Sequence, residues 1–138
     1  VVLLLVVFLL YLLGPTQATI QAAGQPDLIL TAVSTKTTAI APGQTLSVSS
    51  AVKNQGAAVA GSFLIAFHLS TNTVYGDGDD VVITAERNVN LLKVGASSTA
   101  AAKLTIPLNT PVGTYYLCAT ADSGNAVAES NEILVKSA

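Results

Sequence analysis

The sequence predicts an all-β protein, an antiparallel β-sandwich of about seven strands preceded by an apolar N-terminal segment. From Gln25 onward, apolar and polar residues alternate in short runs, and no stretch has the apolar spacing that an amphipathic helix requires. Glycine, proline, asparagine and aspartate separate these runs at intervals of roughly 8–15 residues. Short strands at this spacing are typical of an immunoglobulin-like sandwich.

Turn chemistry and alternation define each expected strand in order. Pro42 fixes its own φ and Gly43 is free to adopt a positive φ, so we expect a turn between the first two strands. Residues 54–56 turn the chain after the second strand, and Pro107 ends the fifth. The expected strands cover residues 27–34, 45–53, 62–70, 81–89, 98–106, 113–122, 126–129 and 133–136.

Two of these strands predict the main core. Each places every second side chain on one face, and both faces are largely apolar. We expect the two faces to meet across the sandwich and to be buried there: Leu46, Val48, Ser50 and Val52 on one strand, and Phe63, Ile65, Phe67 and Leu69 on the other.

Residues 1–13 are an uninterrupted apolar run, VVLLLVVFLLYLL. As a helix this run would span about 20 Å, which is short of the roughly 30 Å hydrocarbon core of a bilayer. Its length fits the apolar core of a secretory signal peptide, and small-x-Ala cleavage sites follow at residues 16–18 and 20–22.

The alternative is a retained segment, because neither an initiator methionine nor a basic region precedes Val1 in this sequence. A retained apolar helix would pack in the core of a pilus-like filament, and contact with a membrane would occur only through residues 1–13. We therefore divide the chain into residues 1–24, the signal-like or assembly segment with its linker, and residues 25–138, the sandwich. Both alternatives place the sandwich outside the cytoplasm, in an extracellular or cell-surface location.

Composition excludes several classes of protein. The formal net charge is −2, and the six lysine and arginine residues are scattered, whereas a nucleic-acid-binding protein carries a clustered basic surface. One cysteine and one histidine exclude an intrachain disulfide and a zinc site built from cysteine and histidine.

Six short motifs follow one another along the sandwich: Pro26-Asp-Leu, Ala41-Pro-Gly-Gln-Thr45, Val52-Lys-Asn-Gln-Gly56, Leu69-Ser-Thr71, Gly113-Thr-Tyr-Tyr-Leu117 and Ala121-Asp-Ser-Gly-Asn-Ala-Val-Ala-Glu-Ser-Asn-Glu132. Together, in this order, they resemble the CARDB family, the cell-adhesion-related, immunoglobulin-like domain of bacterial and archaeal surface proteins. The resemblance implies an exported, non-catalytic structural or adhesion module whose partners are surface proteins or identical subunits. One departure is that Glu132 runs straight into Ile-Leu-Val-Lys, so we expect a short or shifted closing strand.

Three carboxylates within four residues, Asp77, Asp79 and Asp80, form the one candidate metal site. Gly76 and Gly78 let the backbone fold back, and calcium prefers such oxygen ligands. The EF-hand spacing fails because the twelfth position of a loop that begins at Asp77 is not a glutamate. A weak calcium site and a plain solvated turn are both open, and we expect no other cofactor.

His68 is the one side chain suited to act as a base at neutral pH. Alternation places it opposite the apolar face of its strand, together with Ser70, and we expect it to face solvent. Cys118 is expected to be a small buried hydrophobe, with an intermolecular disulfide as the alternative. We expect no catalytic residues and no enzyme.

The last third of the chain carries expectations about structure. Tyr116, two residues before Cys118, fits the tyrosine whose hydroxyl binds backbone at a corner of the sandwich. Asp122 is suited to accept backbone N–H bonds in a turn. Glu129 and Glu132 are expected either at the surface or as braces of the final hairpin. Tryptophan is absent and Tyr75 is the one aromatic expected to be free, which argues against a sugar-binding module.

Overall fold

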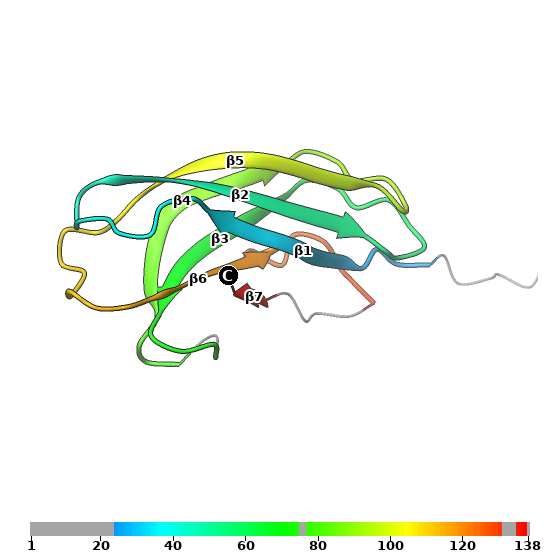
Figure 1. The fold of residues 1–138 in the computed structure, drawn as a ribbon. Coiled ribbons are helices and arrows are strands. Elements are labelled where there is room, and N and C mark those ends of the chain that lie inside the picture. The colour runs from blue at the N-terminus through cyan, green and yellow to red at the C-terminus, as the bar shows by residue number, and fades with distance from the viewer. Residues whose placement is uncertain (1–23, 75–76, 131–134, 138) are drawn as a thin grey trace, which may run out of the picture.

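The computed structural model describes residues 24–74, 77–130 and 135–137, and every regular element in these ranges is a β-strand (Figure 1). The fold class predicted from the sequence is confirmed. The seven strands are β1 (Leu28–Thr35), β2 (Thr45–Asn54), β3 (Phe63–Ser70), β4 (Val81–Val89), β5 (Ser97–Thr105), β6 (Tyr116–Ala121) and β7 (Val135–Ser137).

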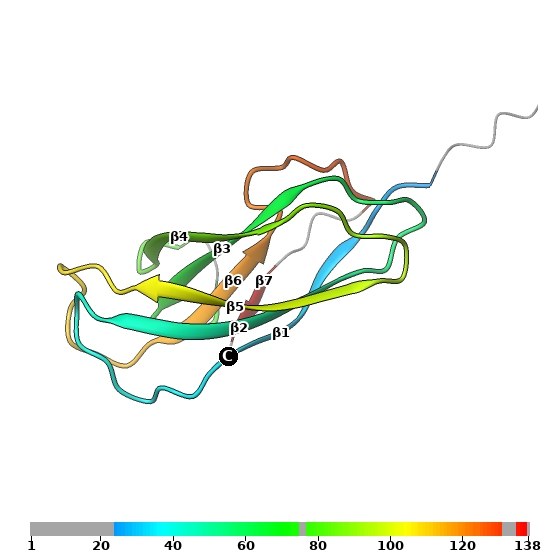
Figure 2. The ribbon, with the colours of Figure 1, turned by 90° about the horizontal axis from the view of Figure 1, so that it is seen from above.

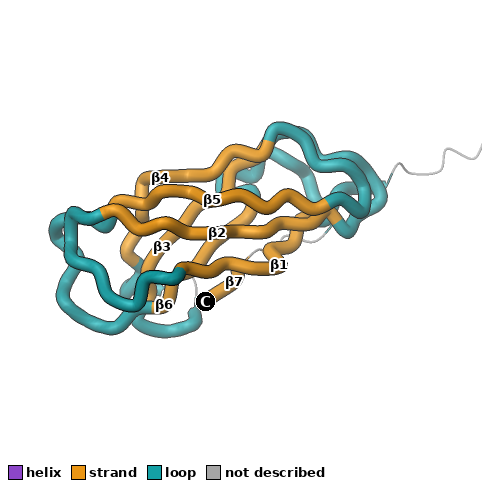
Figure 3. Tube along the Cα trace, turned by 45° about the horizontal axis from the view of Figure 1, so that its top comes forward, coloured by secondary structure: helices purple, strands orange, loops and turns teal. Residues whose placement is uncertain are grey.

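The strands form two antiparallel sheets that pack face to face. One has the order β1-β2-β5 and the other the order β4-β3-β6-β7. Seen from above, the three-stranded sheet crosses over the four-stranded one (Figure 2), and loops gather at both ends of the sandwich (Figure 3). Three strands against four, with β3 leading to β4 in one sheet and β5 returning to the other, is the arrangement of an immunoglobulin-like Greek key.

The core lies where the sequence predicts it. The alternate residues of β2 and β3 that we expect to point inward are all buried, and Val48, Val52 and Ile65 are fully inaccessible to solvent. β4 adds Ile83 and β5 adds Leu104 to the same cluster. Alternation therefore identifies the inward faces correctly, because each sheet has one face against the other sheet.

Arg87 is a charged side chain that points into this core from β4. It is 7% exposed and reaches across the sandwich, donating hydrogen bonds to the carbonyl oxygen and hydroxyl of Ser50 on β2 at 2.9 and 3.0 Å. A third hydrogen bond goes to the hydroxyl of Ser98 on β5. The guanidinium thus links the two sheets through polar contacts close to the middle of the β2 strand.

A second polar cluster holds the chain where it enters the sandwich. Asn54 is fully buried and makes four hydrogen bonds to backbone groups. The backbone of residues 25–27 passes so close to Gly56 that an added Cβ would lie 2.4 Å from the nitrogen of Asp27. Asparagine and glycine are thus required by packing at these two positions of the Val52–Gly56 motif.

One expectation about the C-terminal part needs correction. Residues 126–129 do not form a strand; they belong to a loop that Asp122 holds by accepting hydrogen bonds from the backbone N–H groups of Ala126 and Val127, at 2.9 and 2.8 Å. β7 has three residues, and of the expected range 133–136 the positions 133 and 134 lie outside the described residues. The expectation of a short or shifted closing strand stays a prediction, because residues on both sides of β7 lie outside the described ranges.

Candidate functional site

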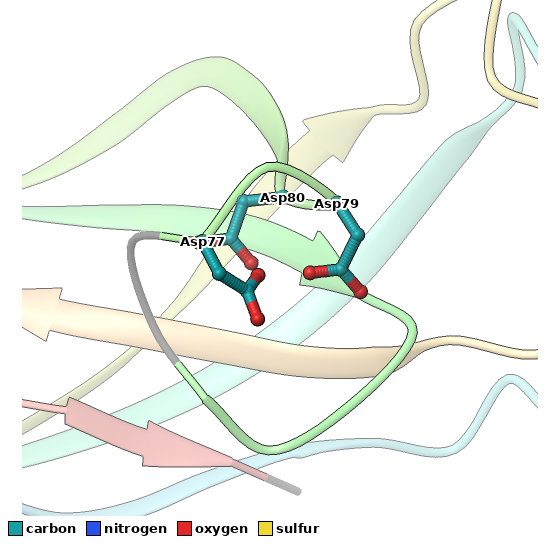
Figure 4. A group of neighbouring side chains, drawn as sticks. All are labelled: Asp77, Asp79 and Asp80. Carbon is teal, nitrogen blue, oxygen red and sulfur yellow. The ribbon is translucent and has the colours of Figure 1, made fainter.

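The acidic loop between β3 and β4 brings the three predicted carboxylates together. Figure 4 shows Asp77, Asp79 and Asp80 turned toward one another on the inner side of the loop. One oxygen from each lies within 4.8 Å of the others. This spacing is compatible with three carboxylates around one hard cation.

Hydrogen bonds within the loop position Asp79 most firmly. Its Oδ2 accepts from the backbone N–H of Thr71 at 2.8 Å and from the Thr71 hydroxyl. The side-chain amide of Asn72 donates to Asp77 at 2.9 Å and to Asp79 at 3.2 Å. The amide hydrogens of Asn72 therefore occupy part of the space between two of the carboxylates and partly offset their mutual repulsion.

These contacts favour the charged form of Asp79. Hydrogen bonding with the side chain of Asp77, then with Thr71, lowers the pKa of Asp79 to about 2. A lowered carboxyl pKa stabilises the folded loop at pH values above about 4, and this contribution is lost as the pH falls toward 2. Asp79 is therefore ionised at neutral pH.

The ligand chemistry fits calcium better than a transition metal. Carboxylate oxygens suit calcium, which takes six to eight oxygen ligands, and the described loop offers three side chains of this type. Water and backbone carbonyls would have to complete the shell. Such a site binds weakly compared with a loop that encloses the ion.

His68 lies on the outer face of the four-stranded sheet, as alternation predicts, but the expectation that it faces solvent is wrong. It is 4% exposed, and its strand neighbours in register are Val82 on β4 and Cys118 on β6. Burial lowers the pKa of His68, and the nearby Asp80 acts in the opposite direction. The acidic loop therefore folds over the outer face of the sheet beside this histidine, which strand periodicity alone could not predict.

Ser70 and Cys118 do not form a nucleophilic site with His68. Ser70 is fully buried, and its hydroxyl donates to Asp79 and accepts from the backbone N–H of Asn72. Cys118 is buried, as expected, and burial, followed by the charges of Asp80 and Asp79, raises the pKa of its thiol. A protonated, buried thiol is not reactive.

Two further expectations need correction. The corner tyrosine is Tyr115, whose hydroxyl donates to the carbonyl oxygen of Pro111 at 3.0 Å, whereas Tyr116 is 43% exposed. Glu129 is buried rather than exposed, and its carboxylate accepts a hydrogen bond from the backbone N–H of Leu28. Glu132 lies outside the described residues.

A groove of about 720 Å³ opens at the end of the sandwich formed by the β1–β2 and β5–β6 loops. Its lining is uncharged and consists mostly of threonine and apolar residues, among them Thr37, Ile40, Pro111 and Val112, together with Gln44 and Tyr115. Acid–base chemistry requires a titratable group, and Tyr115 is the sole titratable side chain of this lining.

Within the ranges that the structure describes, we find no helix with the length and hydrophobicity that crossing a membrane requires.

Comparisons with known proteins give a family whose sequence model matches this chain and solved structures that share its fold. The sequence model of the CARDB family matches residues 25–133. A comparison with curated proteins gives no match.

Two solved structures share the fold. The CARDB domain of a Pyrococcus furiosus protein, solved in complex with di-metal ions, is 20% identical with a TM-score of 0.55, over 82% of this chain and 84% of that chain. The domain of a "putative cell surface protein" from Methanosarcina acetivorans is 22% identical with a TM-score of 0.56, over 83% and 89% of the two chains. The family match covers most of the chain and the fold agrees with it, so this chain belongs to the CARDB family.

Proposed function

We propose that the chain is an exported, non-catalytic module of the cell surface, with a structural or adhesive role. The observation that carries this proposal is the CARDB match over residues 25–133. The M. acetivorans domain, which shares the fold, comes from a protein described as belonging to the cell surface. The division into an export segment at residues 1–24 and a sandwich at residues 25–138 is part of the same proposal.

The placement of polar groups supports a structural role. Apart from His68, the buried side chains that carry a charged or amide group each bind backbone or side chains of the sandwich. These residues are Asn54, Arg87, Asp122 and Glu129. A catalytic site instead needs such groups directed at a substrate. The polar chemistry of the described interior is thus used for folding, which is what a spacer or adhesion module requires.

Surface exposure of the native protein tests the proposal. Intact cells of the source organism are treated with proteinase K and probed with antibodies against the sandwich, and a cytoplasmic protein serves as the control for lysis. We expect loss of the signal on intact cells and survival of the control. Protection of the sandwich until the cells are lysed would contradict export.

N-terminal sequencing of the recovered protein then separates the two forms of the proposal. A start between Thr19 and Gly24 identifies a removed export signal and a free module. A start at Val1 on surface-exposed protein supports the alternative, a subunit held in a filament by residues 1–13.

We also propose weak calcium binding at Asp77, Asp79 and Asp80. The convergence of the three carboxylates supports it, and a CARDB domain of P. furiosus has been solved with di-metal ions. Binding to the folded state alone raises stability, so calcium should raise the melting temperature and a chelator should reverse the rise.

Paired variants test the calcium site. Asp79→Asn should abolish the calcium-dependent rise in melting temperature, whereas Glu86→Gln, an exposed carboxylate on β4, should leave it intact. An equal melting temperature of the wild type with calcium and with chelator would remove the calcium proposal and leave the plain turn.

A further inference from the structure

The two sheets end in four edge strands, and β5 differs from the other three. β1 has a register shift in its pairing with β2, β4 has one in its pairing with β3, and β7 is three residues long. Bulges and short lengths are the devices by which proteins prevent edge strands from pairing with other chains. β5, along the top of Figure 1, pairs with β2 over nine consecutive residues without any shift, so in the described part of the chain it is the long and regular edge.

Backbone hydrogen bonds at both ends of β5 show which groups point to the free edge. The N–H of Ile106 donates to Gln44 at 2.9 Å, and the carbonyl oxygen of Ala96 accepts from Asn54 at 3.0 Å. The even-numbered positions therefore bond to β2, and the unbroken register carries this alternation along the whole strand. The N–H and carbonyl groups directed away from β2 belong to Ser97, Thr99, Ala101, Lys103 and Thr105.

Small side chains leave this edge open to another backbone. Of the nine residues of β5, all but Leu104 are exposed or partly exposed. Even Ala100, which lies on the inward face, is exposed. No bulky side chain shields the centre of the strand, where three alanines follow one another from Ala100 to Ala102.

We propose that β5 pairs with β5 of a second copy of this chain, antiparallel about a two-fold axis at Ala101. This proposal goes beyond the function proposed above and does not depend on residues 1–13. The axis places Ala101 opposite Ala101, Thr99 opposite Lys103 and Ser97 opposite Thr105. The two-fold axis repeats the last two pairings, which gives five facing pairs in all. Each pair exchanges two backbone hydrogen bonds, about ten in total, and these bonds join the two three-stranded sheets into one continuous sheet.

The charge pattern of β5 fits its own copy. Lys103 is the one charged residue of the strand, and in this register it lies beside the hydroxyl of Thr99. The two lysines are about 13 Å apart along the sheet, so no like charges stand side by side. An acidic partner strand is not required, which favours a second copy over a charged foreign segment.

An interface one strand wide is small, so association of the free protein is weak and depends on concentration. On a surface, copies held near one another reach a high effective concentration, and weak edge pairing then suffices to link them. The proposed contact therefore suits lateral association of neighbouring modules.

Cysteine cross-linking in the full chain tests both the contact and its register. In a hydrogen-bonded antiparallel pair the Cα atoms are about 5.5 Å apart, within the range of a disulfide. Ala101→Cys should therefore cross-link to itself under mild oxidation. Thr99→Cys alone and Lys103→Cys alone should not form a disulfide, because each cysteine lies about 13 Å from the same position in the second copy. A mixture of the two variants should cross-link, because position 99 of one copy faces position 103 of the other.

Ser49→Cys is the matched control, because Ser49 lies directly beside Ala101 on the same exposed face, one strand further in. Its own copy would be about 15 Å away. The native Cys118 is buried and gives the background of the wild type. Circular dichroism and melting temperature confirm that each variant folds.

We expect at least about tenfold more cross-linked dimer for Ala101→Cys than for Ser49→Cys. Equal cross-linking of these two variants would overturn the proposal, as would cross-linking of Thr99→Cys alone to the extent of the mixture. Association through the apolar residues 1–13 gives dimers without these register-specific cross-links and so counts against the β5 contact.

Discussion

The replacement Asn54→Leu removes the polar cluster at the entrance of the sandwich while keeping the branched shape of the side chain. Asn54 accepts from the N–H groups of Asp27 and Gly56 at 3.2 and 3.0 Å. It donates to the carbonyl oxygens of Ala58 and Leu92 at 2.8 and 3.1 Å. All four capacities of the amide are thus used, and none of its atoms is exposed.

The expected cost follows from the groups that lose a partner. The carbonyl of Leu92 keeps a hydrogen bond from Ala60 at 3.0 Å, so three backbone groups are left without one. Each unsatisfied buried group costs about 1–3 kcal/mol. The groups are partly buried, so we take the lower part of this range and expect a loss of about 3–5 kcal/mol in the free energy of unfolding.

Urea denaturation followed by far-ultraviolet circular dichroism measures this loss, since the chain has no tryptophan for fluorescence. The control is Gln55→Leu, an exposed neighbour with one hydrogen bond to Asp27, which should change stability by at most about 0.5 kcal/mol. A stability of Asn54→Leu within that same margin would refute the reasoning that this cluster holds the entrance.

Phe67→Ala, at the centre of the core, should cost about 3–5 kcal/mol in the same assay; an effect below about 1 kcal/mol would show that the side chain is not in the core. Arg87→Met should cost about 1–3 kcal/mol because the acceptors on Ser50 and Ser98 lose their donor, and a more stable variant would show that burial of the charge outweighs these bonds. Because the pKa of His68 is lowered in the folded state, the unfolded chain binds protons more readily, so stability should fall as the pH drops below about 6.5. His68→Gln should flatten this fall in stability curves measured between pH 5 and 7; an unchanged curve would assign the dependence to other groups.

Local pattern predicts the strands and inward faces because a strand with one buried face repeats every two residues. The same reasoning places Leu46, Phe63 and Phe67 correctly in the core. The inward position of Arg87 could have been read from its alternation with Ile83 and Val89, but nothing in the sequence near it identifies the acceptors across the sandwich.

Contacts between distant segments account for what the sequence does not predict. Glu129 binds the backbone of Leu28, 101 residues away, so its spacing from neighbouring residues cannot show that it is buried. His68 is buried although its strand position looks exposed, and Asp80, which is close enough to raise its pKa, comes from the β3–β4 loop rather than from the strand itself. Composition predicts the acidic loop, but the donors that Thr71 and Asn72 supply to it depend on the shape of the loop.

Proteinase K accessibility on intact cells tests the central claim of an exported surface module most directly. We expect the sandwich to be degraded on intact cells while a cytoplasmic control protein survives. Survival of the sandwich until lysis, with the control protein also intact, would contradict it.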